Sequence, residues 1–338
     1  MIKEIRDEYQ ILSELGVGGM ATIFKAIQKS LGRPVAIKEL KRTYHADPQI
    51  VQRFEREAKM SASFQHENIV HIYDYWKRPG YCIVMEYVDG TDIAEIIDKI
   101  GVLPVDVGIM ISMQVCSALD YAHMRGLIHR DIKPSNIMIK RNGEVKLMDF
   151  GIAHTKKLQT LTQPGTFLGT PAYMSPEQIL GLPLDAQSDI FSFGIVLYEM
   201  FTGTKPFLDE ETRSVSAKIL KDRFRTPRSL NTRVPRRVQR IIKKCLRKKP
   251  SRRYNSMQEL ARALGRSIAG KTNKSVSLKR ISDHLVEANV FEAPPESETV
   301  MITNVPGRGL FKNLLSAAVV LLVLAAAWAG YYYWSTTQ

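Results

Sequence analysis

The first part of the chain alternates between apolar and polar positions, as strands do when one face of a sheet is buried. A glycine-rich turn, GVGGMA at 16–21, separates two such runs and predicts an antiparallel pair. Asp47 followed by Pro48 is typical of a helix N-terminus, so we expect a helix over 49–63. The expected strands are 9–15, 22–28, 35–40, 68–76 and 81–88. Residues 9–88 therefore predict a mainly antiparallel sheet with one helix.

Helical spacing of apolar residues replaces this alternation further along the chain. One such run begins at residue 105 and stops at Gly126, a residue type common at helix C-termini. Residues 137–148 predict a hairpin with Asn142-Gly143 at its tip. Helical signals then dominate from Ser188 to about residue 269. These elements together predict an α+β fold with the strands concentrated toward the N-terminus.

The C-terminal region changes character twice. Residues 266–312 are polar and contain APPESE, which predicts a linker. Residues 314–334 run 21 positions without a charge, and as a helix they would span about 31 Å, one bilayer core. With cations before this run and aromatic residues at its end, we expect a single-pass transmembrane helix over 313–334 and a short extracytoplasmic tail, 335–338. A buried core helix is the alternative, disfavoured because so little chain follows to pack around it.

Composition is ordinary for a globular protein of 338 residues, with 44% hydrophobic and 24% charged residues. The distribution of charge is unusual. The run 221–253 holds fifteen Lys or Arg and a single acid, and so accounts for the whole formal charge of +14. This basic run predicts a solvated surface, a contact with anionic lipid or a docking site for acidic proteins. No nucleic-acid partner is expected, because no base-reading motif accompanies the charge.

The three cysteines, Cys82, Cys116 and Cys245, are scattered without a Cys-x-x-Cys spacing. This argues against a disulfide framework and against a zinc site, and favours buried free thiols in a reducing compartment. The first ten residues, MIKEIRDEYQ, are too charged for the apolar part of a signal peptide. We therefore expect the bulk of the chain to lie in the cytoplasm.

The segment LIHRDIKPSNIMI, residues 127–139, places His129, Arg130, Asp131, Lys133 and Asn136 between apolar flanks. Burying such groups is costly unless they are paired. The segment is therefore either a surface loop between two strands or a loop that holds a charged, metal-bound substrate. The glycine-rich turn is equally ambiguous, since it suits a plain hairpin or close approach to phosphate. A dinucleotide-binding turn is excluded because the segment after it is too short and β-like for a crossover helix.

Residue types and spacings nevertheless outline a phosphoryl-transfer site. Lys38 ends the apolar strand VAIK and can reach phosphates under the glycine turn. A carboxylate from the helix can hold it, either Glu57, which shares a face with apolar residues, or Glu55, which points away. Asp131 can accept a proton from an attacking hydroxyl, and Lys133 can neutralise charge on the transferred group. Asn136 and Asp149 are oxygen ligands suited to Mg²⁺.

On these motifs the chain resembles a eukaryotic-type Ser/Thr protein kinase, in the style of the bacterial members. The motifs are GVGGMA, VAIK, a helix Glu, HRDIKPSN, DFG, GTPAYMSPE and SDIFSFG, in order over about residues 9–265. The resemblance implies a two-lobed protein-kinase-like fold, with residues 9–88 as the N-lobe and 89–265 as the C-lobe. It implies ATP and Mg²⁺, for which Mn²⁺ can substitute, and catalytic roles for Asp131, Lys133, Lys38 and Glu57.

The resemblance also implies how the nucleotide is held. Glu86 and Val88 would offer backbone groups to adenine, Met85 would be the gatekeeper and Asp92 would accept a ribose hydroxyl. The expected phosphate cradle is Leu15, Gly16, Val17, Gly18, Gly19, Met20, Ala21, Thr22 and Ile23, together with Lys38. Glu177 should pair with Arg253, and Asp189 should brace the backbone of the HRD segment. Lys133 and Thr170 favour Ser or Thr over Tyr as the acceptor.

Three positions depart from the family pattern: Ala21 in place of a glycine, Ser175 in place of an alanine and Lys249 where an aspartate is common. None of them is a phosphate or metal ligand, so activity is still expected. Arg130 beside Asp131 predicts activation by a phosphate on the loop 154–170. Thr166 and Thr162 are the favoured acceptors for autophosphorylation over Thr155 and Thr160, whereas Thr170 is expected to be structural.

The expected protein is thus a membrane-tethered Ser/Thr protein kinase whose catalytic domain faces the cytoplasm of a bacterial cell. Its partners would be protein substrates and the membrane, with self-association left open. The alternative is a catalytically silent kinase-fold scaffold. Such a scaffold would be expected to lack Lys38, Asp131 or Asp149, and all three are present.

Overall fold

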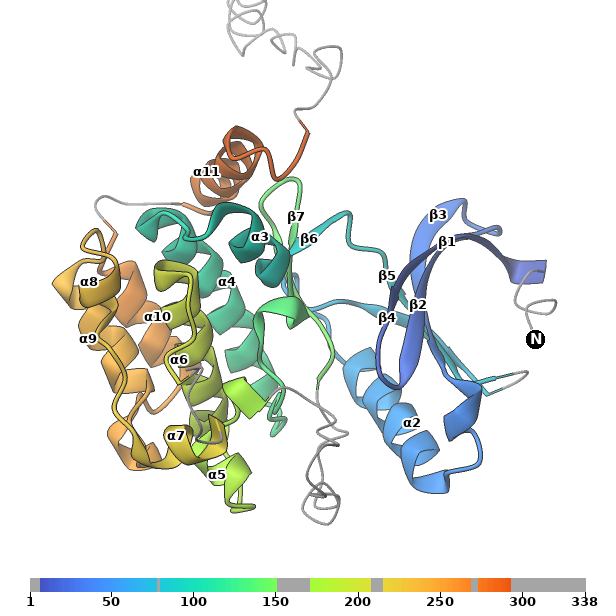
Figure 1. The fold of residues 1–338 in the computed structure, drawn as a ribbon. Helices are drawn as coiled ribbons and strands as arrows, with labels where there is room; N and C mark the ends of the chain where they lie inside the picture. The colour runs from blue at the N-terminus through green and yellow to red at the C-terminus, as the bar shows by residue number, and fades with distance from the viewer. Residues whose placement is uncertain (1–6, 78–79, 151–170, 208–214, 269–272, 293–338) are drawn as a thin grey trace, which may run out of the picture. The chain divides into compact units, whose positions relative to one another are not determined.

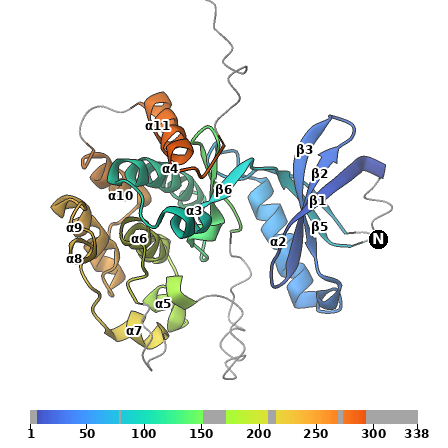
Figure 2. The ribbon, with the colours of Figure 1, turned by 45° about the horizontal axis from the view of Figure 1, so that its top comes forward.

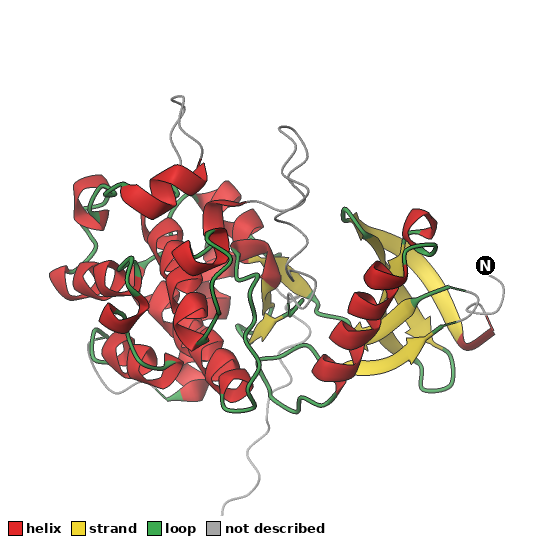
Figure 3. Cartoon of the chain, turned by 90° about the horizontal axis from the view of Figure 1, so that it is seen from below, coloured by secondary structure: helices red, strands yellow, loops and turns green. Residues whose placement is uncertain are grey.

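The computed structural model describes residues 7–77, 80–150, 171–207, 215–268 and 273–292. These residues form two lobes (Figure 1). Figure 3 shows most strands gathered in one lobe beside a single long helix, and helices filling the other lobe. The α+β, two-lobed fold expected from the sequence is confirmed.

The small lobe is built on an antiparallel sheet of five strands in the order β1-β2-β3-β5-β4. The strands are β1 (Tyr9–Val17), β2 (Ala21–Gln28), β3 (Arg33–Leu40), β4 (Ile72–Trp76) and β5 (Cys82–Glu86). Each expected strand is present, and the glycine-rich turn joins β1 to β2. A short 3-10 turn, η1 (Arg42–Tyr44), follows β3.

Helix α2 (Pro48–Ala62) packs against this sheet and begins as expected. The Asp47 carboxylate accepts hydrogen bonds from the backbone N–H groups of Gln49 and Ile50, at 2.8 and 3.3 Å. Such a cap satisfies donors that have no partner within the helix. The buried side chains Phe54 and Ala58 then fix which face of α2 meets the sheet.

The large lobe begins with a small sheet in the order β6-β7-β8, and helices form the rest. The predicted hairpin is β7 (Ile137–Lys140) with β8 (Val145–Leu147), and β6 (Gly90–Asp92) pairs with β7. The longer helices are α3 (Ile93–Ile100), α4 (Val105–His123), α6 (Ala186–Thr202), α9 (Arg236–Cys245), α10 (Met257–Gly265) and α11 (Lys274–Glu287). The shorter elements are η2 (Pro134–Asn136), η4 (Pro171–Tyr173), α5 (Pro176–Ile179), α7 (Val215–Lys221), α8 (Pro227–Leu230) and η5 (Pro250–Arg252).

One core holds the large lobe together, with α6 at its centre. Nearly every residue of α6 is buried, as expected of a helix that is apolar all round and surrounded by other elements. The apolar residues of α4 belong to the same core cluster. This packing supports the residues that follow α4, where the polar segment 127–139 lies.

Helix α11 corrects one sequence expectation. The region 266–312 was expected to be a linker, yet residues Lys274–Glu287 within it form a helix. The Asn273 side chain caps this helix by accepting from the Val276 N–H at 2.8 Å. Ile281 and Leu285 are fully buried in the core of the large lobe, and Figure 2 shows α11 beside α4. The linker prediction is therefore wrong for this segment, because two apolar residues one turn apart are a weak signal in a polar sequence.

In the part of the chain that the structure describes, no helix is both long enough and apolar enough to cross a membrane. The expected transmembrane helix over 313–334 and the tail 335–338 lie outside the described residues.

Candidate active site

Lys38 joins the two lobes through two carboxylates. Its Nζ lies 2.7 Å from Glu57 Oε1 on α2 and 2.7 Å from Asp149 Oδ1, which follows β8. Glu55 instead pairs with Lys59 and Lys77, on the outer side of α2. The structure therefore assigns Glu57, and not Glu55, as the partner of Lys38.

The charges of this triad are interdependent. Burial alone would lower the pKa of Lys38, but the adjacent Asp149 and Glu57 carboxylates raise it above its usual value. Burial raises the pKa of Glu57, while the Lys38 ammonium opposes that change. Lys38 is thus held as a cation in a nearly buried place, which is what a phosphate-positioning lysine requires.

The polar segment 127–139 turns out to be internally paired. Lys133 Nζ lies 2.8 Å from Asp131 Oδ2. Asn136, in η2, donates from its amide nitrogen to the Asp131 carbonyl at 2.7 Å and to Asp131 Oδ2 at 3.1 Å. The side chains of Asp131 and Lys133 remain about a third exposed, at 29% and 31%. They are therefore both held in place and accessible to a substrate.

Asp189 braces the backbone of this segment, as expected. Its carboxylate accepts from the N–H of His129 at 2.8 Å and from the N–H of Arg130 at 3.0 Å. Arg130 has a φ of 69°, a left-handed conformation that is unfavourable for a side chain of this kind. The buried Asp189 and the amide of Gln178, which donates to the Arg130 carbonyl at 2.6 Å, hold that conformation in place.

His129 contributes to the site in a way that the sequence did not reveal. Its Nδ1 accepts from the Asp131 N–H at 3.3 Å, so Nε2 is the donor to the Met148 carbonyl, 3.1 Å away. Its ring packs 4.6 Å from Phe150, which in turn packs 5.3 Å from Phe64. Burial lowers the pKa of His129. A neutral, buried imidazole thus ties the Asp131 backbone to the residues on either side of Asp149.

The expected phosphate cradle lies at the turn between β1 and β2. Residues 15–19 are exposed, and the Gly18 N–H donates to the Ala21 carbonyl at 2.8 Å, which closes the turn. Ala21 itself is buried in the apolar cluster beneath the sheet. Glycine permits the close backbone approach that phosphate binding needs, so this geometry suits the expected role.

The expected adenine-binding residues lie where the lobes meet. Met85 and Val88 are buried together with Val70 and Ala36, and this cluster offers an apolar surface of the kind that a purine ring requires. Asp92 caps α3 by accepting from the Glu95 N–H at 3.0 Å, and burial raises its pKa. Its role toward a ribose hydroxyl remains a prediction.

The metal ligands expected from the sequence lie on either side of the β7–β8 hairpin. The amide nitrogen of Asn136 is used in both bonds to Asp131, which leaves its carbonyl oxygen as the atom able to bind a metal. Among the described residues, no group of three or more His, Cys, Asp or Glu could hold a metal by itself. Two oxygen donors fit Mg²⁺, which keeps several waters and is shared with substrate phosphates.

Glu177 and Arg253 form the expected ion pair deep in the large lobe. The guanidinium donates to both carboxylate oxygens, at 2.6 and 3.0 Å. Burial alone would raise the pKa of Glu177, but Arg253 lowers it below its usual value. The pair anchors the segment after residue 170; Gly151, Thr170 and the four candidate threonines of the loop lie outside the described residues.

The basic run 221–253 has mixed roles in the fold. Arg253 is fully buried, whereas Arg236, Arg237, Arg240 and Lys243 are exposed along α9. The opposite face of α9 is buried in the core of the large lobe. A solvated basic face is therefore present, and its partner stays a prediction.

Comparisons with known proteins agree with this geometry. Residues 9–264 match the protein kinase domain family. Serine/threonine-protein kinase PrkC of Bacillus subtilis is 40% identical over 259 residues, which cover 76% of this chain and 40% of that protein. PknB of Mycolicibacterium smegmatis is 33% identical over 335 residues, 96% of this chain and 53% of that protein. The chain thus spans about half, or less, of the length of the curated relatives it matches.

A solved structure shows the same architecture. The Mycobacterium tuberculosis PknI kinase domain superposes with a TM-score of 0.60 and 27% identity, over 77% of this chain and 95% of that one. The family match covers about three quarters of the sequence, and it includes the residues that the structure brings together around Lys38 and Asp131. By this match and this geometry, the chain belongs to the protein kinase domain family.

Proposed function

We propose that this protein is an active Ser/Thr protein kinase that transfers the γ-phosphoryl group of ATP to protein hydroxyls. The observation that carries the proposal is the position of Lys38, 2.7 Å from both Glu57 and Asp149. This arrangement holds a cation where it can orient phosphates, and it is expected only when the small and large lobes are aligned for transfer.

The transfer requires little covalent chemistry from the protein. The bond between the γ-phosphorus and its bridging oxygen breaks, the acceptor hydroxyl oxygen forms a new bond to phosphorus, and the hydroxyl proton passes to the Asp131 carboxylate. Lys133, 2.8 Å from Asp131, offsets negative charge on the group in transit. Mg²⁺ bound by Asn136 and Asp149 would supply charge neutralisation to the phosphates. Catalysis is then mostly positioning and electrostatic stabilisation.

A silent scaffold is the competing function, and the chain does not favour it. Inactive forms of such a fold are expected to lack one of the charged residues used above. Lys38, Asp131 and Asp149 are all present, and each has a partner that fixes its position.

The test is phosphate transfer by the full chain, purified in detergent, with ATP, Mg²⁺ and a generic protein substrate. Transfer to Ser or Thr that is lost in both Asp131→Asn and Lys38→Met is the expected result. Mapping the phosphates would also test autophosphorylation, which we propose on Thr162 or Thr166. ATP binding without any transfer, in the wild-type chain, would favour the scaffold.

We further propose that the chain is held at a bacterial cell membrane, with its catalytic domain on the cytoplasmic side. The uncharged run 314–334 supports this, as do the cations before it and the aromatic residues at its end. Retention of the full chain in the membrane pellet after alkaline carbonate washing is the expected result. Release into the supernatant would contradict it.

The exposed cations of α9 provide a second contact with the membrane in this proposal. Several Lys or Arg side chains near an anionic surface contribute about 1 kcal/mol each. The test is binding of the full chain to anionic against neutral vesicles, with Arg236, Arg240 and Lys243 changed to Gln in the control. Equal binding of wild type and control to anionic vesicles would contradict this role.

A further inference from the structure

Helix α11 lies beyond the family match, which ends at residue 264, yet it is an integral part of the large lobe. Ile281 and Leu285 are completely buried, and Phe291 after the helix is 7% exposed. Arg280 pairs with Asp106 at the start of α4, with 3.0 Å between Nε and Oδ2. The helix is thus docked by both apolar and polar contacts.

Besides α4, helix α11 covers the tip of the β7–β8 hairpin. The Ser282 hydroxyl donates to the Arg141 carbonyl at 2.5 Å, and the Arg141 guanidinium lies 5.3 Å from the Phe291 ring. Gly143 approaches α11 so closely that a Cβ there would lie 2.1 Å from the Leu278 carbonyl oxygen. The hairpin tip and the helix therefore cannot shift independently.

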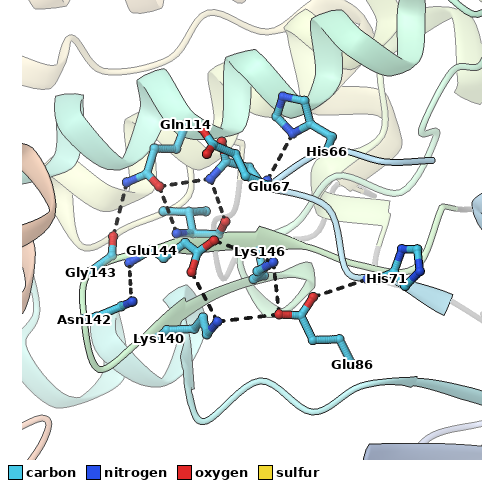
Figure 4. Close-up of polar contacts among 12 residues, drawn as sticks. His66, Glu67, His71, Glu86, Gln114, Lys140, Asn142, Gly143, Glu144 and Lys146 are labelled. Atoms are coloured by element: carbon cyan, nitrogen blue, oxygen red, sulfur yellow. Dashed lines mark hydrogen bonds and ion pairs between the residues drawn. The ribbon is translucent and has the colours of Figure 1, made fainter. Parts of the chain in front are cut away.

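The same hairpin supports the connection between the lobes. From it, Lys146 Nζ lies 3.0 Å and Lys140 Nζ 3.5 Å from Glu86 Oε1, at the end of β5. The Arg141 N–H donates to the Asp89 carbonyl at 3.2 Å. Figure 4 shows the Glu86 side chain extending toward Lys140 and Lys146. The hairpin thus holds in place the segment from Glu86 to Asp89, which contains the residues expected to contact adenine.

Gln114 of α4 links the hairpin to the segment between α2 and β4. Its amide nitrogen donates to the Gly143 carbonyl at 3.2 Å, and its amide oxygen accepts from the Val145 N–H at 3.0 Å (Figure 4). The same oxygen accepts from Asn68 at 3.0 Å, in the segment that leads from α2 into β4. Lys274 of α11 pairs with the neighbouring Glu67. A continuous set of contacts therefore runs from α11 through the hairpin to both connections between the lobes.

We propose that α11 is a positioning element of the nucleotide site, which acts through Lys146 to hold Glu86 and the strand β6 in the conformation that binds ATP. This proposal rests on the proposed kinase function. It assigns a purpose to the buried Lys146, which pairs with Glu86 and Glu144, and to a helix outside the catalytic motifs. If α11 undocked, Lys38, Asp131 and Asp149 would stay in place. The segment expected to hold the adenine ring would become more mobile.

The first test compares two aspartate substitutions on α11 in the full chain. Ile281→Asp removes a buried anchor, whereas Val276→Asp is the matched control, because Val276 is 52% exposed. For Ile281→Asp we expect KM for ATP and Kd for ADP to rise about threefold to thirtyfold, with kcat changed less than twofold. Amides of residues 86–92 should also exchange hydrogen faster. A folded Ile281→Asp variant with wild-type KM, Kd and exchange would overturn the proposal.

The second test keeps the proposal falsifiable if Ile281→Asp does not fold. Lys146→Met removes the shorter of the two ion pairs of Glu86, and Lys146→Arg retains a cation at the same place. We expect Lys146→Met to raise KM for ATP without an equal loss of kcat, and Lys146→Arg to restore most of the affinity. Equal ADP affinity in wild type and Lys146→Met would overturn the proposal.

These tests are separable from the test of kinase activity. A wild-type chain that binds ADP but transfers no phosphate would refute the proposed function, and the ADP affinities would still decide the role of α11. A wild-type chain that transfers phosphate, with ADP affinity unaltered in every variant, would refute the positioning role alone.

Discussion

Lys38 Nζ and Glu57 Oε1 lie 2.7 Å apart, so two residues nineteen positions apart in the chain join a strand to a helix at one charged contact. The apolar face of α2 that packs on the sheet places Glu57 opposite Lys38. Because Lys38 also binds Asp149 from the large lobe, the rotation of α2 and the placement of Asp149 are coupled. The position of a single helix therefore determines whether Lys38 is placed as the proposed function requires.

Glu57→Gln should lower kcat/KM for phosphate transfer by about 100-fold, the effect expected when a reacting group is misplaced by about an ångström. The amide retains the shape of the side chain but not its charge, so Lys38 loses one of its two anions. Glu55→Gln is the matched control, since Glu55 lies on the same helix and pairs with the exposed Lys59 and Lys77. Steady-state kinetics gives kcat/KM for both variants. Similar losses of kcat/KM in the two would contradict the assignment of Glu57.

Glu177→Gln should destabilise the large lobe by about 3 kcal/mol, because a fully buried Arg253 would then lack its counter-charge. Urea denaturation measures the change. Lys59→Gln is the control, since it breaks an exposed pair whose contribution is below about 1 kcal/mol. A loss in Glu177→Gln no larger than in the control would show that the buried pair does not anchor this segment.

The free energy of unfolding should rise as pH increases from about 5.5 to 7.5. Burial lowers the pKa of His129, so the unfolded chain binds a proton at pH values where the folded chain does not. Stability is then fully present above the ordinary histidine pKa and is lost as pH falls below it. His66 and His284 act in the same direction, because burial lowers their pKa values too.

Denaturation at several pH values tests this, and the slope is compared with that of His129→Gln. The variant should show a shallower slope than wild type, with the remainder due to the other two histidines. A slope that is unchanged by the substitution would show that His129 is not the neutral, buried group described above.

None of the three thiols should react with an aromatic disulfide reagent at pH 8 in the native protein. All three cysteines are buried, and burial raises the pKa of Cys82 and of Cys245 to about 12 and that of Cys116 well above its usual value. A thiol that is both protonated and inaccessible is a poor nucleophile. All three should react after denaturation in urea, and rapid reaction of any one in the native chain would contradict this structure.

Residue types at fixed spacing allowed much of the catalytic site to be predicted. Asp131 and Asn136 are five positions apart in one loop, and Asp149 follows a short hairpin, so local geometry alone brings them close. The start of α2 was also predictable, because the cap of Asp47 and the proline after it act within one helical turn. Such features depend on neighbours in the chain, and the sequence contains those directly.

Contacts between distant segments were harder to predict. The choice of Glu57 over Glu55 depended on which face of α2 meets the sheet, and periodicity favoured it without deciding it. The role of His129 required Phe150 and Met148 to be packed around its ring. The residues around His129 in the sequence do not indicate that its imidazole ring is buried and neutral.

By itself, then, the sequence determined the fold class, the residue types of the candidate site and the approximate elements, because these follow from local spacing and from the pattern of apolar positions. Only the tertiary structure decided that α11 contacts the β7–β8 hairpin and that Lys146 forms an ion pair with Glu86. Both depend on the summed burial of a few apolar side chains and on ion pairs across long sequence separations. Their contribution to the free energy of folding can be assessed only once the tertiary structure shows which surfaces exclude water.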